Sequence, residues 1–177
     1  MKKLLKKCLA VTLAALLLAT PGMKLLAGEP AARNIGVFRV DGGDARLART
    51  FGGSTTSPRD GQRLNVGNVM TTGHDTQVYM QLDTDSILKM DEESQVAVGS
   101  AGNLLSLSVF YGSALVDAAQ QASGQSLETR IGNITTGVRG TLFIAGIREN
   151  GAVVVTMLSA KGQSMYMMAR AESWRCR

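Results

Sequence analysis

Apolar and polar residues alternate along most of the chain after residue 34. The clearest run is Thr76–Asp83, in which Val78, Met80 and Leu82 are separated by Gln77, Tyr79 and Gln81. Alternation with a period of two places neighbouring side chains on opposite faces of a β-strand. We therefore expect a strand here, with one face in the core and the other in water.

Other segments extend or complicate this pattern. Leu105–Tyr111 alternates in the same way, whereas Val153–Leu158 is apolar on both faces and is expected to be a central strand in the core. Ser113–Ala122 contains good helix formers, so a short helix is possible, but a strand that runs into a loop is preferred. Gly52–Arg59 is poor in apolar residues and is expected to be an exposed loop.

Turn-forming residues separate the runs, and the chain contains 20 glycines. Asn150-Gly151 predicts a two-residue hairpin, because both central positions of such a turn favour a positive φ. Each strand with its turn takes roughly 8–14 residues, a spacing typical of all-β proteins. The pattern predicts a single all-β domain, a solenoid-like or sandwich-like stack of short antiparallel strands.

The first 27 residues have the three-part layout of a secretory signal peptide. Four early lysines precede an apolar run from Leu9 to Ala19, which Thr20-Pro21-Gly22 terminates. Cleavage after Gly22 or after Ala27 fits, with a slight preference for Ala27. An uncleaved anchor is the alternative, but a spanning helix needs about 20 apolar residues and this run is interrupted. We expect a secreted, periplasmic or envelope protein with no stable membrane span after cleavage.

Removal of this leader changes both the charge and the cysteine content. The formal net charge of +5 reflects 19 basic and 14 acidic residues, but five lysines lie before Gly28, so 14 of each sign would remain. A neutral domain has no basic field to attract phosphates, so we expect no nucleic-acid partner. Cys176 would be the one remaining cysteine, which excludes an intramolecular disulfide, and a frayed tail position is preferred to intermolecular pairing.

Several segments together resemble the FecR domain. Val138–Phe143, which reads Val-Arg-Gly-Thr-Leu-Phe after the threonine-bearing segment 129–136, resembles the signature of that family. Leu64–Gly73 is similar to a second family element, with Asn68 where aspartate is usual, and a hairpin ending at Ser94 follows. The resemblance covers Gly36–Met168. It divides the chain into a signal peptide (1–27), a FecR-like β domain (35–168) and a tail (169–177).

This resemblance implies an all-β extracytoplasmic domain. In members that sense ferric siderophores, such a domain relays a signal from an outer-membrane receptor and is joined to a segment that binds a sigma factor. Only seven residues precede the apolar run here, so we expect no sigma-factor-binding segment. The expected function is a binding module for an unidentified envelope or surface protein, in sensing or signal relay. The alternative is a structural or adhesive cell-surface protein.

The signature residues are expected to be structural. Gly137 and Gly140 bracket Val138 and Arg139, where a positive φ or a close backbone approach favours glycine. Arg139 is either a clamp that bonds carbonyls or carboxylates inside the core, which is preferred, or a group offered to a partner's carboxylate. Phe143 is expected to fill the core. The proposed structural set is Gly137, Val138, Arg139, Gly140, Thr141 and Phe143.

Candidate chemistry outside the signature is sparse. His74 is the sole histidine and is expected to be a surface turn residue, so a metal site with two histidines is excluded. The acids of 83–85 and 91–93 are expected to be solvated, because Ile87 and Leu88 stand where a calcium loop needs an oxygen ligand and a glycine. We therefore expect no catalytic residue, no metal, no cofactor and no enzyme activity.

A cluster near the end of the chain is the one candidate partner surface. It comprises Met165, Tyr166, Met167 and Met168, which would be apolar on both faces of a strand. At the edge of a sheet, such a strand would offer both backbone groups and side chains to another chain.

Overall fold

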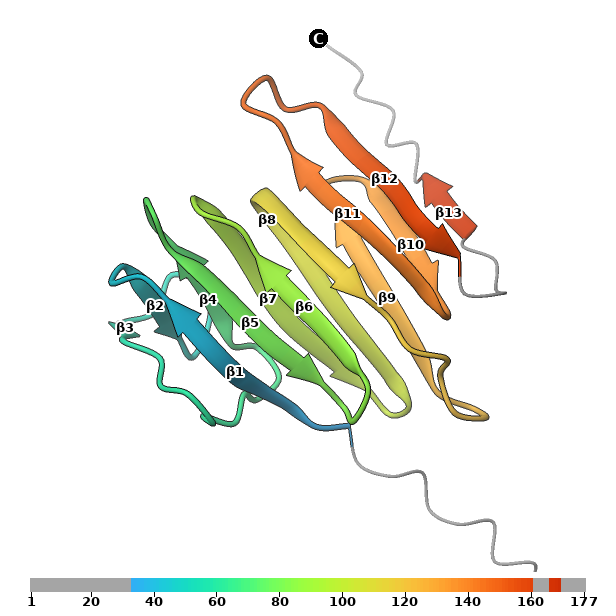
Figure 1. Cartoon of the computed structure of the whole chain (residues 1–177), viewed down its shortest axis with the longest axis horizontal. Coiled ribbons are helices and arrows are strands. Elements are labelled where there is room, and N and C mark those ends of the chain that lie inside the picture. The colour runs from blue at the N-terminus through green and yellow to red at the C-terminus, as the bar shows by residue number, and fades with distance from the viewer. Residues whose placement is uncertain (1–32, 161–165, 170–177) are drawn as a thin grey trace, which may run out of the picture. The chain divides into compact units, whose positions relative to one another are not determined.

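The computed structural model describes residues 33–160 and 166–169, and every regular element in these ranges is a strand (Figure 1). The all-β prediction is therefore confirmed. The strands are β1 (Ile35–Asp41), β2 (Ala45–Ala48), β3 (Thr55–Thr56), β4 (Val69–Thr72), β5 (Gln77–Leu82), β6 (Ser86–Met90), β7 (Ser94–Ala101), β8 (Leu104–Asp117), β9 (Ser126–Ile131), β10 (Ile134–Val138), β11 (Thr141–Ile147), β12 (Val153–Ala160) and β13 (Tyr166–Ala169).

The strands form two layers that share β8. The first layer has the order β1-β5-β6-β8-β11-β12, and the second has the order β3-β2-β4-β7-β8-β9-β10-β13. The N-terminal half of β8 pairs with β7 and β9, whereas its C-terminal half pairs with β6 and β11. Figure 1 shows the two layers lying over one another. The sandwich-like architecture is thus one continuous sheet that folds back on itself at β8.

Among the described strands, the pairing is antiparallel with one exception. β8 and β9 run parallel, from Leu104 beside Ser126 to Val109 beside Ile131. The prediction of an antiparallel stack is therefore wrong for this pair. Its cause is the bend in β8, which brings Asp117 back toward the end where β8 began, so that residues 118–125 can lead into a strand of the same direction.

Short turns carry the chain between layers at one end of the sandwich. We call these the crossing turns: residues 42–44, 73–76 and 91–93, together with the bend of β8 at Gly112. They pack closely, because a Cβ on Gly42 would lie 2.4 Å from the carbonyl oxygen of Asp75. Glycine permits both this approach and the positive φ of 105° at Gly42.

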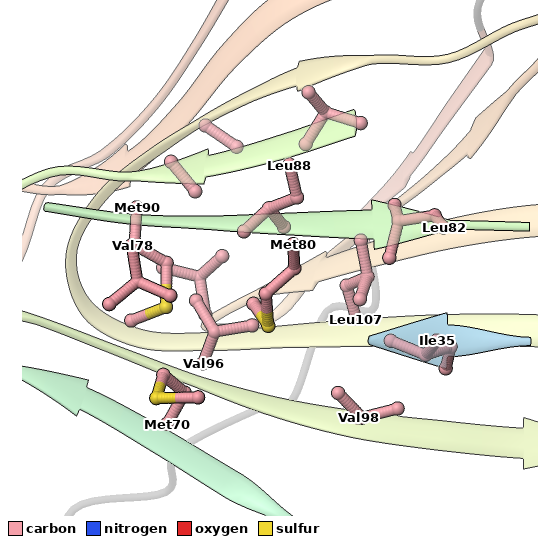
Figure 2. Close-up of a cluster of buried hydrophobic side chains, with 14 of the residues drawn as sticks. Ile35, Met70, Val78, Met80, Leu82, Leu88, Met90, Val96, Val98 and Leu107 are labelled. Carbon is pink, nitrogen blue, oxygen red and sulfur yellow. The ribbon is translucent and has the colours of Figure 1, made fainter. Parts of the chain in front are cut away.

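The core lies between the two layers. Figure 2 shows inward side chains of the first layer, among them Val78, Met80 and Leu82, facing Val96 and Val98 of the second. All of these are buried, and for Val78, Met80 and Leu82 the alternation predicted this. Phe143 of β11 is fully buried, so its expected role in the core is confirmed. Removal of this apolar surface from water stabilises the fold at about 25 cal/mol per Å².

The prediction for Val153–Leu158 is wrong. This segment forms most of β12, which pairs only with β11 among the described strands and so lies at the edge of the first layer. Met157 is 44% exposed and Leu158 is 51% exposed. An apolar run on both faces of a strand does not distinguish a central strand from an edge strand. The periodicity of the side chains indicates which faces of the strand are apolar, but not how many neighbouring strands pair with its backbone.

Three local predictions have different outcomes. The hairpin at residues 148–151 is longer than predicted: Gly151 N–H donates to the Arg148 carbonyl at 2.8 Å, and of Asn150 and Gly151 only Gly151 has a positive φ. The Asn150 side chain instead accepts the N–H of Ala152 at 3.0 Å.

The strand preferred for residues 113–122 is confirmed as far as Asp117. The expected loop 52–59 is exposed but contains the two-residue strand β3.

Candidate functional site

Buried hydroxyl groups connect the crossing turns to one another. Thr72 Oγ1 donates to the Asp91 carbonyl at 2.6 Å and accepts the N–H of Ser94 at 3.0 Å. Ser94 Oγ accepts the N–H of Ser113 at 2.9 Å and lies 3.0 Å from the Ser113 carbonyl. Each side chain therefore bonds the backbone of the next turn, which fixes the three segments in one geometry.

The same arrangement continues to the first crossing turn. Thr76 Oγ1 accepts the N–H of Asp44 at 3.1 Å and donates to the His74 carbonyl at 3.1 Å. The Gly73 N–H donates to the Asp44 carbonyl at 2.8 Å. Because backbone bonds and buried hydroxyls hold the turns, the side chains at the tips of the turns are free to face solvent.

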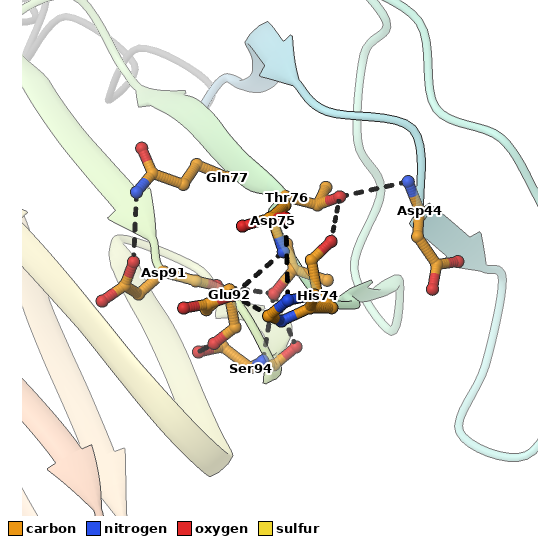
Figure 3. A network of polar contacts seen from close by, with 9 residues as sticks. Asp44, His74, Asp75, Thr76, Gln77, Asp91, Glu92 and Ser94 are labelled. Carbon is orange, nitrogen blue, oxygen red and sulfur yellow. Dashed lines mark hydrogen bonds and ion pairs between the residues drawn. The ribbon is translucent and has the colours of Figure 1, made fainter.

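His74, Asp75 and Glu92 meet on two neighbouring turns (Figure 3). His74 Nδ1 lies 3.0 Å from Glu92 Oε2, and the same oxygen accepts the N–H of Asp75 at 2.9 Å. His74 is 78% exposed, which confirms its prediction as a surface turn residue. The donor atoms of the three side chains lie within 4.8 Å of one another, so they could hold a metal ion. The expected absence of a metal remains a prediction.

A broad groove with a volume of about 1460 Å³ lies beside this cluster. Strands contribute apolar side chains, and the connections contribute the charged ones. The aliphatic and aromatic lining residues are Tyr111, Ile144, Ile147 and Val154, and the lining also contains one histidine and four charged residues, His74, Glu92, Glu93, Arg148 and Glu149. Gly112 and Gly146 also line the groove, and a Cβ on Gly146 would lie 3.0 Å from the Gly112 carbonyl oxygen. The sequence did not predict this groove, because the lining residues come from strands and turns that are distant from one another along the chain.

The signature residues lie at the opposite end of the sandwich. The register of β11 on β8 places Ile147 beside Gly112 but Leu142 beside Asp117, so the two ends of β11 lie far apart. Gly140 connects β10 to β11 with a φ of 67°, as expected, whereas Gly137 has no positive φ and sits between Glu128 and Tyr166 in the sheet. Val138 and Thr141 are buried on either side of this turn.

The preferred prediction for Arg139 is wrong. Its side chain is exposed, and within residues 33–160 and 166–169 no hydrogen bond or ion pair ends on it. The reason is its position at the tip of the turn from β10 to β11, where the neighbours Val138 and Thr141 take the inward positions. The alternative, in which Arg139 is offered to a partner's carboxylate, remains open.

A buried arginine that the sequence analysis did not identify joins distant segments. Arg33 Nη2 lies 3.0 Å from Asp83 Oδ2 and donates to Gln121 Oε1 at 3.0 Å, and its side chain is only 3% exposed. Asp83 also accepts the N–H of Asn34 at 2.9 Å. Asp83 is therefore not the simple solvated turn residue that we predicted. Its partner is 50 positions away in the sequence, and no local pattern marks such a pairing.

Asn68, which stands where related sequences are expected to have aspartate, is buried and bonded through both ends of its amide. Its Oδ1 accepts the N–H of Asn65 at 2.9 Å, and its Nδ2 donates to the Arg49 carbonyl at 3.2 Å. An ionised aspartate could make the first bond but not the second, because a carboxylate only accepts. The amide therefore suits this position as a structural link.

The remaining predictions concern segments of which little or nothing is described. Tyr166, Met167 and Met168 belong to β13, which pairs only with β10 among the described strands and so ends the second layer. Their role as a partner surface stays a prediction, and Met165 lies outside the described residues. The leader with its two cleavage positions, Cys176 and the tail from residue 170 lie outside them as well. Among the described residues, no helix is long and apolar enough to span a membrane.

Comparison with known proteins gives one finding. The profile of the family described as FecR protein matches residues 68–161, more than half of the chain. No curated protein and no solved structure matches the chain. All residues that line the groove, from Thr72 to Val154, lie within the matched segment.

Proposed function

The chain belongs to the FecR protein family, an envelope signalling-related family, and from that premise we propose that it is an extracytoplasmic binding module. It acts through protein–protein contact in envelope sensing or signal relay. The observation that carries this proposal is the groove, because the family domain alone builds it. The signal-peptide pattern of residues 1–27 supports export of the domain.

The dimensions and chemistry of the groove support a protein as its ligand. Pockets for small molecules usually measure about 300–1,000 Å³ and enclose most of the ligand. This groove is larger, at about 1460 Å³, and open. Apolar strand residues next to charged turn residues resemble the apolar centre and polar rim of a protein interface. Three of the charged lining residues are glutamates, which favours a partner surface with basic side chains.

We propose binding rather than catalysis at this site. His74, Asp75 and Glu92, which lie close together and could transfer a proton, are all exposed to water. Electrostatic catalysis is most effective in sites that exclude water. Exposure of these groups is instead suited to the steering of a charged partner.

Site-specific crosslinking in the native envelope tests this function. A photoreactive phenylalanine analogue at Tyr111, inside the groove, is expected to give an adduct with one specific protein. The same analogue at Phe38, which is exposed but does not line the groove, is expected to give none. The adducts are measured by immunoblot and mass spectrometry. Equal adducts at both positions, or no adduct at native abundance, would count against the proposal.

A structural or adhesive surface role is the second candidate. The apolar strand β12 favours it, because no described strand other than β11 pairs with it and exposed edge strands associate with other chains. Deletion of the protein separates the two functions. Altered surface integrity with unchanged transcription would favour the adhesive role, whereas loss of a transcriptional response would favour signalling.

A further inference from the structure

The free side of β12 carries backbone groups that the described part of the chain leaves without a strand partner. The N–H of Arg148 donates to the Ala152 carbonyl at 3.0 Å, which sets the phase of the β11–β12 ladder. In an antiparallel pair, alternate residues direct both backbone groups toward the neighbouring strand. Val154 and Thr156 therefore bond to β11, and Val153, Val155 and Met157 direct their N–H and C=O groups away from it.

The opposite edge of the first layer is covered. The N–H of Val37 in β1 donates to the Gln62 carbonyl, and the Val37 carbonyl accepts the N–H of Gly61, both at 2.8 Å. The N–H of Leu64 donates to the Ile35 carbonyl at 2.8 Å. The fold thus protects β1 with a segment of its own chain, whereas the strand pairing places no described strand along β12. Natural proteins usually protect bare edges because they associate.

The side chains of β12 that face the core are only partly buried, so the core is exposed to solvent along this strand. Met157 lies opposite the fully buried Phe143 and so belongs to the core side, yet it is 44% exposed. Val153 and Val155 on the same side are only partly buried. The segment from Ala152 to Ala160 contains no charged residue and no proline, which are the usual features that prevent strand pairing at an edge.

We propose that β12 is a homodimer interface, in which a second copy of this chain adds its own β12 in antiparallel orientation with the two-fold axis at Val155. In this register Val155 faces Val155 of the second copy, and Val153 faces Met157. Every backbone group that points away from β11 then meets its complement. The contact is the same patch on both copies, so it closes as a dimer and does not extend into a fibre.

The chemistry of β12 selects a second copy over a different protein. A strand without charge offers nothing that would attract or orient a charged segment, and self-pairing brings no like charges together. The pairing also joins the core sides of the two copies, which would cover Met157 with the second copy's Val153. β12 contributes Val154 to the groove, but the outer backbone edge and the side chains of Val153, Val155 and Met157 do not line it, so each proposal can fail without the other.

The mass and the amide exchange of the full exported protein test the proposal. Sedimentation equilibrium at about 5 and 500 µM should show a monomer becoming a dimer. Hydrogen exchange resolved by residue should then show amides of Val153, Val155 and Met157 that slow as the concentration rises. The amides of Val154 and Thr156, which bond to β11, should be slow at both concentrations. A monomer at the higher concentration would overturn the proposal, as would exchange at the first three amides that does not change.

Substitutions test directly whether the outer edge of β12 forms the dimer interface. Val155→Pro removes an N–H that points away from β11, so it should keep the fold and raise the dimer dissociation constant at least about 100-fold. Ile87→Lys changes an apolar residue on β6 that is 44% exposed, as Met157 is, and should leave that constant within about threefold. If Val155→Pro unfolds by circular dichroism, Met157→Lys replaces it. Unchanged dimerisation of a folded edge variant would contradict the proposal.

Discussion

Replacement of Gly112 by alanine is expected to cost more than about 3 kcal/mol of unfolding free energy, a large part of the roughly 5–15 kcal/mol that stabilises a typical domain. Gly112 has a φ of 72°, which alanine adopts only with strain. A Cβ would also lie 2.2 Å from Ser94 Oγ and 2.4 Å from the Glu93 carbonyl oxygen. The substitution would therefore displace Ser94, whose hydroxyl joins the third crossing turn to β8. Urea unfolding followed by circular dichroism measures the loss.

Gly102→Ala is the matched control for this prediction. Gly102 has a φ of 58°, but a Cβ there would have no heavy atom within 4 Å. It should therefore cost only the backbone strain, about 1–2 kcal/mol. Similar losses for the two variants would contradict the claim that close packing of the crossing turns stabilises this end of the sandwich.

Phe143→Ala is the second substitution with a large expected effect, a loss of about 3–5 kcal/mol. The ring is fully buried between the layers, and its removal leaves a cavity that the surrounding strands cannot fill without moving. β11 pairs with both β8 and β12, so local movement there would disturb the strands that line the groove. Thermal and urea unfolding should both report the loss.

Phe110→Ala is the matched control for Phe143→Ala, because it removes a phenylalanine ring from the surface and not from the core. Phe110 is 44% exposed and contacts Phe51, with ring centroids 5.1 Å apart. Removal of this surface pair should cost about 1 kcal/mol. If Phe110→Ala destabilised the protein as much as Phe143→Ala, Phe143 would not be the dominant aromatic residue of the core.

The sequence predicted those features of the fold that depend on side-chain alternation. Val78, Met80 and Leu82 are buried because every second residue of a strand faces the same layer. The same reasoning failed for Val153–Leu158. The side chains there are apolar, but the position of a strand in a sheet depends on which other strands are available to pair with it. That information is non-local, and the prediction of a central strand was wrong.

The candidate site could be predicted only in its parts. His74 was correctly placed at a surface turn, but its contacts with Glu92 and the groove depend on other connections between strands, about 20 to 75 residues away along the chain, that meet it at one end of the sandwich. Arg139 was placed in the core because it stands among the residues of a buried signature. Its exposure follows from its place in the turn between β10 and β11, where the neighbouring Val138 and Thr141 are buried.

We propose that partner binding takes place at the groove and not at the signature end of the sandwich. Capture of the native envelope partner by folded variants with one end altered at a time tests it most directly. Glu93→Lys combined with Glu149→Lys should lower recovery of the partner at least about 10-fold, because the two introduced lysines would repel a basic surface that the glutamates attract. Arg139→Glu, an exposed charge reversal at the opposite end, should leave recovery unchanged. Loss of the partner with Arg139→Glu and full recovery with the groove variant would contradict the account.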